Sequence, residues 1–373
     1  MKAWPTVGIL VVQLILFLAH LFLYVTWIFF WPGLSAAEAA DLRAAILLLA
    51  FSFVPAALLS FRYANPIVSC FYAAAAIWLG FLNFLSLAAA ASWPVWLALR
   101  LAGVRAAPGV LRPWINGSLS ALAILVSIYG LFNARRVCVR RYAVRLAHLP
   151  QAWRVRTAVV MSDLHLGNIN GVRFCRRMVR LAARLKPDIV FVPGDLFDGV
   201  KADLDRLLAP FAELKPPLGV YFSTGNHEEF VHPAHYIEAI TRAGIRVLAN
   251  ERVTVDGLHI AGIGYRDSTY PIRVRALLEG MNLGGAQASI LLHHAPTRLP
   301  IVEQAGVSLQ LSGHTHGGQF FPYNWITRRV FGEFTVGFHR FGGLQVCTSS
   351  GAGTWGPPMR VGTRAEIVAL EFE

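Results

Sequence analysis

Hydrophobic residues follow two different patterns along this chain of 373 residues. In the first third, four long apolar runs stand between short polar stretches, at about residues 7–30, 44–61, 67–91 and 115–133. Each run is close to the roughly 20 residues that a helix needs to cross a bilayer. We therefore predict four membrane-spanning helices. The first run is too long for the apolar core of a cleaved signal peptide, which has roughly 7–15 residues, so we expect a retained helix.

Beyond the fourth run, short apolar segments alternate with amphipathic ones. Period-two alternation or a continuous apolar run predicts strands at residues 141–146, 158–161, 189–192, 220–222, 290–292 and 307–311. The Asp256-Gly257 pair predicts a hairpin turn between two further strands, 252–255 and 259–262. Helices are expected at about 172–186, 202–214, 233–243, 272–280 and 297–305. This alternation predicts an α/β domain at residues 135–373, after a transmembrane region at residues 1–134.

Composition and charge divide the chain at the same place. Of its 21 acidic residues only Glu38 and Asp41 precede residue 134, and 55% of all residues are hydrophobic. The densest positive cluster follows the last apolar run and comprises Arg135, Arg136, Arg140, Arg141 and Arg145. Because positive loops stay on the cytoplasmic side, we predict an integral, multi-span membrane protein whose second domain is cytoplasmic. The loop between the third and fourth runs opposes this orientation, since it carries Arg100, Arg105 and Arg112.

Five short motifs carry the candidate chemistry. In chain order they are Asp163-Leu164-His165, Gly194-Asp195-Leu196-Phe197-Asp198, Gly225-Asn226-His227-Glu228, His294-Ala295-Pro296 and Gly313-His314-Thr315-His316. Each motif follows a predicted strand, and ligands at the carboxyl ends of strands can converge on one crevice. Aspartate, imidazole and amide oxygen together form a donor set suited to Mn²⁺, Fe or Zn²⁺. The motifs therefore predict a site for two divalent metal ions.

These five motifs, in this order, resemble those of the calcineurin-like metallophosphoesterase family, in its membrane-linked type with an N-terminal multi-span region. The resemblance implies a four-layer α-β-β-α sandwich, in which two mixed sheets face each other and the metals lie at the strand ends. It also implies the ligands: Asp163, His165 and His316 for the first ion, Asn226, His294 and His314 for the second, and Asp195 as the bridge. Two such ions would activate a water and offset charge that develops in an in-line displacement at phosphorus.

Two residues beside these ligands are candidates for catalysis. Since Asn226 already fills the ligand position, His227 is expected to protonate the leaving oxygen or to stabilise the transition state; the alternative is a packing histidine. Asp198 is expected to hydrogen-bond the ring of His227 and fix its tautomer, with a helix-capping role as the alternative. Of the adjacent pair His293 and His294 only one can point at the metals, and the H-x-P spacing selects His294. We expect His293 to support the ligands from behind, with substrate contact as the alternative.

Three surfaces are candidates for substrate selection. The first is the aromatic stretch 320–325, which either forms a rim that contacts lipid or is buried; from Glu333 onward we expect a buried strand. The second is a helical face, either solvated or in contact with anionic lipid, that carries Arg173, Arg176, Arg177, Arg180 and Arg184. The third is the glycine-rich segment 351–358, which either lines the mouth of the site or forms a turn packed by Trp355.

These features favour a membrane-anchored, two-metal phosphoesterase that hydrolyses a phosphodiester or pyrophosphate bond. A lipid-linked substrate such as a nucleotide-diacylglucosamine would suit the membrane helices and the net charge of +13. Two alternatives stay open: a phosphatase or phosphodiesterase for a soluble substrate, and a non-catalytic membrane scaffold that retains a metal site. No nucleic-acid-binding module is recognisable, so the expected partners are the bilayer and the phosphoester. His20, inside the first run, is expected to be a neutral ring hydrogen-bonded within the bundle, near Gln13 or Asn83.

Overall fold

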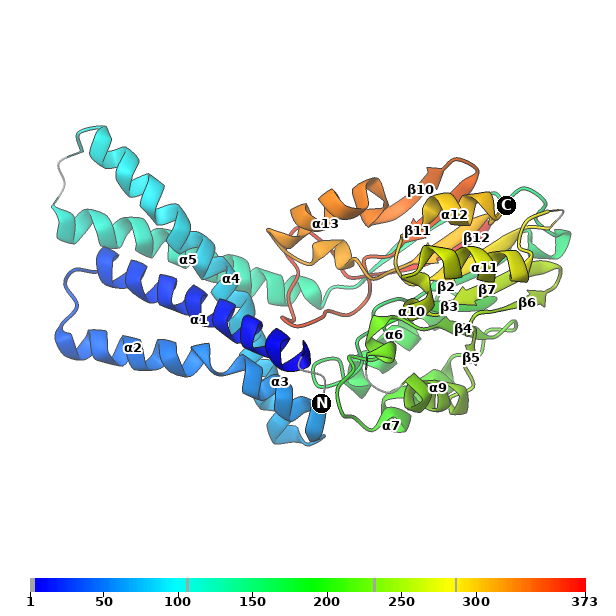
Figure 1. Cartoon of the computed structure of the whole chain (residues 1–373), viewed down its shortest axis with the longest axis horizontal. Coiled ribbons are helices and arrows are strands. Elements are labelled where there is room, and N and C mark those ends of the chain that lie inside the picture. The colour runs from blue at the N-terminus through cyan, green and yellow to red at the C-terminus, as the bar shows by residue number, and fades with distance from the viewer. Residues whose placement is uncertain (1–3, 105–106, 231–232, 286) are drawn as a thin grey trace. The chain divides into compact units, whose positions relative to one another are not determined.

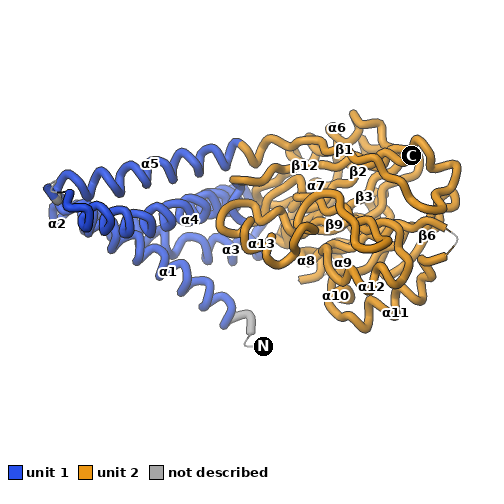
Figure 2. Tube along the Cα trace, turned by 90° about the horizontal axis from the view of Figure 1, so that it is seen from above, with its two compact units in different colours: residues 1–132, 356–359 blue, residues 133–355, 360–373 orange. Residues whose placement is uncertain are grey.

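The computed structural model describes residues 4–104, 107–230, 233–285 and 287–373. Arg105, one of the three arginines that oppose the predicted orientation, lies outside these residues. The chain divides into two compact units (Figure 2): a helical unit, residues 1–132 with 356–359, and a sheet unit, residues 133–355 with 360–373.

The helical unit is built from long apolar helices (Figure 1): α1 (Trp4–Phe30), α2 (Ala36–Ala50), α3 (Phe53–Arg62), α4 (Pro66–Leu101) and α5 (Pro108–Ala134). Within the described residues, four segments are long and apolar enough to cross a membrane: Val7–Phe30, Ala36–Arg62, Pro66–Leu101 and Gly109–Ala134. The four predicted spans are therefore confirmed as candidate membrane helices. Their exposed apolar side chains, such as Leu48 at 75% and Ile67 at 82%, suit a lipid environment better than water.

The second span is interrupted, because α2 ends at Ala50 and α3 begins at Phe53. Pro55 lacks the backbone N–H that would donate to the carbonyl oxygen of Phe51, so the helical ladder breaks one turn before the proline. At the other end of α2 a capping box fixes the first turn, in which Ser35 and Glu38 exchange hydrogen bonds.

His20 occupies a hydrogen-bonded place within the bundle, as we expected. The indole N–H of Trp78 donates to its Nε2 at 2.9 Å, so Nδ1 carries the ring hydrogen and donates to the carbonyl oxygen of Leu16 at 2.7 Å. The partner is thus Trp78 rather than Gln13, whose amide donates to the carbonyl oxygen of Ala50 at 3.0 Å. The pair ties α1 to α4.

The sheet unit contains two mixed sheets of six strands each. The first has the order β1 (Cys138–Val144), β12 (Glu366–Phe372), β2 (Thr157–Val160), β3 (Ile189–Pro193), β4 (Val220–Ser223), β5 (Arg246–Val247). The second has the order β10 (Gly337–Phe341), β11 (Leu344–Thr348), β9 (Leu309–Ser312), β8 (Ser289–His293), β7 (Leu258–Ile263), β6 (Glu251–Val255). The strand predicted near residue 141 is thus the edge strand β1, and the predicted hairpin joins β6 to β7.

Alternation along the strands places side chains in three apolar clusters. On β2, Ala158 and Val160 pack between the sheets, whereas Val159 points to the outer face of the first sheet. That outer face is covered by α6 (Val172–Ala183), α7 (Leu204–Leu208) and α9 (Pro233–Arg242). The outer face of the second sheet is covered by α11 (Pro271–Met281) and α12 (Leu299–Gln304). The predicted α-β-β-α sandwich is therefore confirmed (Figure 1).

Shorter helices lie in the loops: α8 (Asn226–Glu229), α10 (Tyr265–Ser268), α13 (Tyr323–Phe331), and the 3₁₀ turns η1 (Gln151–Trp153), η2 (Ala209–Glu213), η3 (His316–Gly318) and η4 (Gly332–Thr335). Two predicted elements are shorter than their sequence patterns indicated. The helix expected at 202–214 ends at Leu208 and continues as η2, because Pro210 removes a backbone donor. The strand expected from Glu333 begins only at Gly337, because the Thr335 hydroxyl donates to the carbonyl oxygen of Gly332 at 2.7 Å and closes η4.

Candidate metal centre

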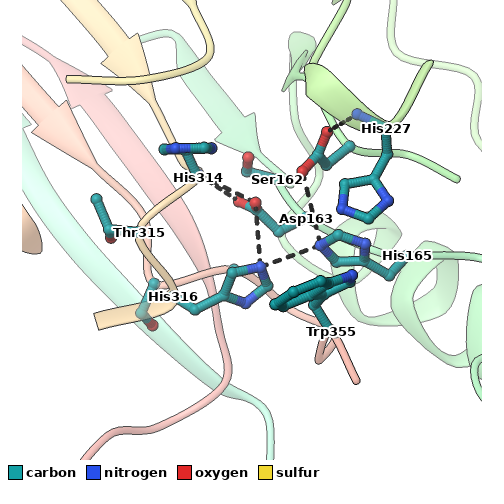
Figure 3. Close-up of polar contacts among 12 residues, drawn as sticks. Ser162, Asp163, His165, His227, His314, Thr315, His316 and Trp355 are labelled. Atoms are coloured by element: carbon teal, nitrogen blue, oxygen red, sulfur yellow. Dashed lines mark hydrogen bonds and ion pairs between the residues drawn. The ribbon is translucent and has the colours of Figure 1, made fainter. Parts of the chain in front are cut away.

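The predicted ligands lie on loops at the strand ends of both sheets. Asp163, Asp195 and Asn226 follow β2, β3 and β4 of the first sheet. His294 and His314 follow β8 and β9 of the second sheet. Because these strands are parallel within each sheet, their carboxyl ends share an edge, and the side chains meet in one largely buried site. Of these side chains, Figure 3 labels Asp163 and His314, which lie next to each other.

Five predicted ligands have left-handed backbone conformations. The angle φ is +53° at Asp163, +46° at His165, +51° at Asp195, +69° at His314 and +50° at His316. Residues with a Cβ avoid this region, which costs them roughly 1–2 kcal/mol each. Such conformations persist where the surrounding fold over-determines them, and they cluster at functional sites. The fold therefore tolerates local strain that aims these side chains at one point.

Glycines of the motifs make room for this convergence. A Cβ at Gly225 would collide with the carboxylate of Asp195. A Cβ at Gly313 would collide with the carboxylate of Asp163. At Gly194, where φ is +90°, a Cβ would collide with a ligand ring. The glycines are thus needed so that the backbone can approach the donor groups closely.

The donor atoms form three overlapping groups. Within each group they lie within 4.8 Å of one another: Asp163 with His165 and His316, His165 with Asp195 and His227, and Asp195 with His294 and His314. The carboxylate oxygen Oδ2 of Asp195 lies 3.2 Å from Nε2 of His294 and 3.7 Å from Nε2 of His165. Asp195 therefore stands between the two sets of nitrogen donors, where a bridging ligand belongs.

Of the ligands predicted for the second ion, His294 and His314 lie on either side of the amide of Asn226. Its Oδ1 lies 2.9 Å from Nδ1 of His314 and 3.2 Å from Nε2 of His294. An amide carbonyl oxygen is a ligand for hard or borderline cations, as imidazole nitrogen is for transition metals. The three side chains thus form a compact O/N donor set.

The ligands predicted for the first ion, Asp163, His165 and His316, also lie close to one another. Nε2 of His165 and Nε2 of His316 lie 3.0 Å apart, and Oδ1 of Asp163 is 3.5 Å from Nε2 of His316 (Figure 3). Both carboxylate oxygens of Asp163 also accept from the backbone N–H of His314, at 3.0 and 3.1 Å. Because only one hydrogen atom can lie between two ring nitrogens, this arrangement suits nitrogens that share a cation.

The pKa values of these groups also indicate a site that suits bound cations. Burial raises the pKa of Asp163. Burial acts in the same direction on Asp195, but the charge of His294 outweighs it and holds the pKa of Asp195 well below its usual range. Burial would lower the pKa of His294, yet Asp195 raises it to about 10, while burial lowers the pKa of His314 to about 3. Divalent cations would satisfy both carboxylates and leave the imidazoles neutral, so the residues present fit a two-metal site.

His227 lies beside the predicted ligands. Its backbone N–H donates to Oδ1 of Asp195 at 3.0 Å, and its ring meets that of His165 edge-on, with 4.6 Å between centroids. Burial and the neighbouring His165 lower its pKa, so the ring is neutral at pH 7. Nδ1 lies 3.1 Å from the backbone carbonyl oxygen of Asp198. Since a carbonyl oxygen can only accept, Nδ1 carries the ring hydrogen.

The side chain of Asp198 differs from what we expected. Its Oδ1 is 4.0 Å from Nδ1 of His227 but 3.4 Å from Nδ1 of His165. The carboxylate oxygen therefore lies closer to a predicted metal ligand than to His227. The tautomer of His227 is still set by Asp198, but through its backbone carbonyl oxygen.

Glu228 belongs to the third motif, and sequence reasoning missed its role. It is fully buried and accepts backbone hydrogen bonds from Asp195 at 3.1 Å, Phe197 at 2.9 Å and Gly225 at 2.8 Å. Burial and the charge of Asp195 raise its pKa to about 7. Glu228 thereby ties the loops after β3 and β4 together. A local signal existed, because a glutamate three residues after Gly225 stands at the acidic position of a capping box.

Arg360 is the second residue that sequence reasoning missed, and no local pattern points to it. It is fully buried, and its guanidinium donates to the carbonyl oxygens of Ser350 at 2.7 Å, Gly353 at 2.7 Å and His316 at 3.2 Å. Burial lowers its pKa to about 10, so it stays charged at neutral pH. Arg360 joins the loop after β11 to the turn that carries His316.

His293 lies behind the site. It is the last residue of β8 and is fully buried. Leu291, two residues earlier and on the same face of the strand, packs in the cluster under α11 and α12. Burial lowers the pKa of His293 to about 4. A supporting role for His293, as predicted, would therefore act through the sheet rather than by contact with the metals.

Aromatic side chains surround the histidines of the site. Between ring centroids, His227 lies 5.7 Å from Phe230 and 6.0 Å from Trp355, and His314 lies 6.2 Å from Phe331. Phe230 and Trp355 are 69% and 57% exposed. Phe230, Phe331 and Trp355 are named the aromatic rim below. Within the glycine-rich segment, Trp355 is thus the residue that lies beside His227.

The aromatic stretch at residues 320–325 is partly buried and partly exposed. Phe320 is 5% exposed and packs inside the fold. Phe321, Tyr323 and Trp325 are 50%, 50% and 56% exposed, on and just before α13, a helix without buried residues. Arg329 lies over the ring of Trp325, 4.8 Å from its centroid. Directly after the last predicted ligand, α13 thus presents apolar and basic side chains to its surroundings.

Comparisons with known proteins agree with this geometry. The family model described as calcineurin-like phosphoesterase matches residues 157–318, which contain all the predicted ligands. An "uncharacterized metallophosphoesterase" of Aquifex aeolicus is 33% identical over 262 residues, which cover 68% of this chain and 98% of that protein. Two proteins described as "transmembrane protein with metallophosphoesterase domain", from Danio rerio and Bos taurus, are each 32% identical over 67% of this chain. The matched parts cover 60% and 61% of these two vertebrate proteins.

Proposed function

This chain belongs to the calcineurin-like metallophosphoesterase family, and we propose that it hydrolyses a phosphodiester or pyrophosphate bond at a two-metal site in a membrane-anchored protein. The observation that carries the proposal is the position of Asp195, whose Oδ2 stands between His294 at 3.2 Å and His165 at 3.7 Å. A carboxylate shared by two sets of nitrogen donors is the arrangement that holds two cations close together. The donor set fits Mn²⁺, Fe or Zn²⁺.

We assign the ligands as Asp163, His165 and His316 for one ion, Asn226, His294 and His314 for the other, and Asp195 for both. When bound, such ions lower the pKa of a water and neutralise phosphoryl oxygens. The amide oxygen of Asn226 adds no negative charge, which keeps the site attractive to an anionic phosphoester. Six of the seven ligands are buried and His314 is partly buried, which strengthens each electrostatic contact.

His227 is proposed to act on the leaving oxygen. Its Nδ1 is engaged with the carbonyl oxygen of Asp198, so Nε2 is the ring atom left for a substrate. Its backbone hydrogen bond to Asp195 fixes the residue relative to the bridging carboxylate. In the neutral ring Nε2 has only a lone pair, so it must first take up a proton from solvent; transfer of that proton to the leaving oxygen accelerates such reactions by typically 10²–10⁴-fold.

The substrate is proposed to be lipid-linked, such as a nucleotide-diacylglucosamine. Support comes from the aromatic rim, where Phe230 and Trp355 are more than half exposed beside His227. Exposed aromatic and basic residues of α13 add a second surface of the same kind. Such a surface can contact acyl chains while its arginines bind phosphate. Four candidate membrane helices tether the site to the bilayer in which such a substrate resides.

The sheet unit is proposed to lie in the cytoplasm. The support is the cluster of arginines that follows the last candidate span, including Arg135, Arg136 and Arg140. Reporter fusions placed after Arg136 test the orientation, since a reporter active only outside the cytoplasm should stay silent there. Activity of that reporter would reverse the assignment.

The test of the proposed function is hydrolysis by the full chain, purified in detergent and loaded with Mn²⁺, against a panel of soluble and lipid-linked phosphoesters. Chelation should abolish turnover, and return of the metal should restore it. Preference for lipid-linked members of the panel would support the substrate proposal, whereas equal rates would favour the soluble alternative. Metal binding without turnover on any phosphoester would favour the scaffold alternative.

A further inference from the structure

Arginine side chains line a groove of the sheet unit that takes no part in the proposed metal site. The groove has a volume of about 740 Å³ and lies between α6 and the segment that leads into β1. Its lining contains seven arginines: Arg135, Arg136, Arg173, Arg176, Arg177, Arg180 and Arg184. Val137, Met178 and Leu181 complete it with apolar surface. This feature is the arginine groove.

The wall formed by α6 is fixed by packing. Its arginines recur at intervals of three and four residues, so they share one face of the helix. On the other face, Cys175, Val179 and Ala182 are fully buried against the first sheet. Turning the arginines away from the groove would therefore expose core side chains.

The opposite wall is held at both of its ends. The amide of Asn133 donates to the carbonyl oxygens of Arg360 at 3.0 Å and Thr363 at 2.9 Å. From Cys138 onward the chain is paired with β12. Arg135 and Arg136 lie between these two anchors, so the groove is built into the fold.

Positive charge in the groove is mostly uncompensated. Among the residues that the structure describes, its ion pairs are those of Arg176 and Arg180 with one carboxylate, Glu213, at 3.4 and 3.6 Å. Burial and the nearby charge of Arg135 lower the pKa of Arg177. Because the fold holds these guanidinium groups close together, an anion bound between them would reduce their mutual repulsion. Guanidinium groups match phosphate oxygens in charge and geometry, so the groove has the chemistry of a phosphate site.

The chain connects this groove directly to a candidate membrane helix. α5 ends at Ala134, one residue before Arg135. Consecutive Cα atoms are about 3.8 Å apart, so Arg135 stays within reach of the headgroup layer of a bilayer that α5 crosses. Each basic side chain near an anionic bilayer strengthens binding by a factor of about five. Among phosphate sources, an anionic lipid is therefore the one that the covalent structure brings closest.

Arg135 and Arg136 lead into the first residue of β1, and this end of β1 lies on the side of the first sheet where the predicted metal ligands follow their strands. β1 pairs with β12 from Cys138 opposite Glu366, and β12 pairs with β2 so that Val368 faces Val160. The start of β1 is therefore level with the end of β2, which Asp163 follows. A ligand in the groove would hold this edge of the sheet.

We propose that the arginine groove binds the phosphate headgroup of an anionic lipid and so holds the edge of the first sheet at the bilayer surface. The groove is separate from the proposed catalytic site, because none of its seven arginines is among the proposed ligands. Its lipid is a bound anchor and not the substrate. The groove can therefore function even if the proposed activity is wrong.

The test is a calorimetric titration of the purified full chain, in neutral detergent and excess chelator, with dihexanoyl phosphatidylglycerol below its micelle concentration. The chelator keeps the metal site from binding or hydrolysing the probe. Dihexanoyl phosphatidylcholine carries the same acyl chains on a zwitterionic headgroup. We expect saturable, one-site binding of the phosphatidylglycerol, weakened by salt, and no binding of the phosphatidylcholine.

Two triple variants each remove three positive charges, one inside the groove and one outside it. Arg173→Gln/Arg177→Gln/Arg184→Gln removes three groove arginines that form no ion pair among the described residues, and should weaken binding roughly 100-fold. The matched control, Arg154→Gln/Arg275→Gln/Arg340→Gln, changes three exposed arginines outside the groove and should bind as the wild type does. Circular dichroism checks that both remain folded. Both should hydrolyse a soluble phosphodiester at the wild-type rate.

Four results would overturn the proposal. Inorganic pyrophosphate that binds in the groove as tightly as the phosphatidylglycerol would assign it to a soluble phosphate. A short RNA that binds more tightly than the lipid, and loses binding in the groove variant, would assign it to nucleic acid. No binding by the wild type, or equal affinities of the groove and control variants, would leave a solvated basic surface.

Discussion

The guanidinium of Arg360 donates a hydrogen bond to the carbonyl oxygen of His316 at 3.2 Å, and its Nη2 lies 3.4 Å from Nδ1 of the same histidine. A fully buried cation thus stands behind a proposed metal ligand. Burial, the charge of His165 and that of Arg360 all lower the pKa of His316. This keeps the ring neutral, as a metal ligand must be, and its Nε2 lies 3.0 Å from Nε2 of His165.

Arg360→Gln should therefore destabilise the protein and weaken metal retention. Several buried carbonyl oxygens would lose a charged donor, and each unsatisfied group costs about 1–3 kcal/mol, so we expect a loss of about 3 kcal/mol of unfolding free energy. Thermal unfolding and metal analysis by mass spectrometry measure the two effects. Arg364→Gln, at an exposed neighbour, is the matched control. Equal stability and metal content of the two variants would show that Arg360 has no such role.

Asp195→Asn should remove metal and turnover together. The neutral amide cannot bridge two cations, and each ion contributes several kcal/mol of transition-state stabilisation, so activity should fall by roughly 10³-fold or more. Metal content per chain and hydrolysis of an aryl phosphodiester are the measurements. Asp205→Asn changes an aspartate in a surface ion pair with Arg242 and should leave both unchanged. Full activity of Asp195→Asn would exclude the proposed mechanism.

His293 should make the metal-free protein less stable in mild acid. Its pKa is lowered from 6.5 to about 4 in the folded state, so between these values the unfolded chain binds more protons and stability falls as pH falls. His293→Gln lacks this titration. The stability advantage of the wild type over the variant should shrink by about 2 kcal/mol between pH 7 and pH 5, measured by denaturant unfolding in chelator.

The exposed substitution His235→Gln provides the comparison for this pH series. Its difference from the wild type should stay the same at both pH values. A constant difference for His293→Gln as well would mean that His293 does not stay neutral inside the fold.

Removal of a ring from the aromatic rim should lower kcat/KM for lipid-linked substrates more than for soluble ones. Trp355→Ala removes an exposed ring beside His227, and an aromatic contact with an acyl chain contributes about 2 kcal/mol. We expect kcat/KM to fall roughly 30-fold on a lipid-linked phosphoester and little on an aryl phosphodiester. Ile272→Ala, at a residue that is 84% exposed on α11, is the control. Equal losses on both substrates would favour the soluble-substrate alternative.

Local patterns were sufficient for most of the fold. The spans follow from run length, and strands such as Ile189–Pro193 and Ser289–His293 are nearly continuous apolar segments whose ends are marked by glycine or histidine motifs. Element limits were less predictable where one side chain acts on the backbone. Pro55 splits the second span, and Thr335 closes a turn where alternation alone predicted strand. These effects depend on single hydrogen bonds, which hydrophobic periodicity does not record.

By itself the sequence determined the candidate donors, their order at strand ends and the four apolar spans, because composition, periodicity and motif spacing are properties of neighbouring residues. Tertiary structure decided which atoms meet. It set the Asp198 carbonyl oxygen, instead of the carboxylate, against His227, and it brought Arg360 to His316 across 44 residues. It also closed the arginine groove by placing Arg135 beside Arg177. Such contacts join distant segments through sheet pairing and core packing, so no local pattern contains them.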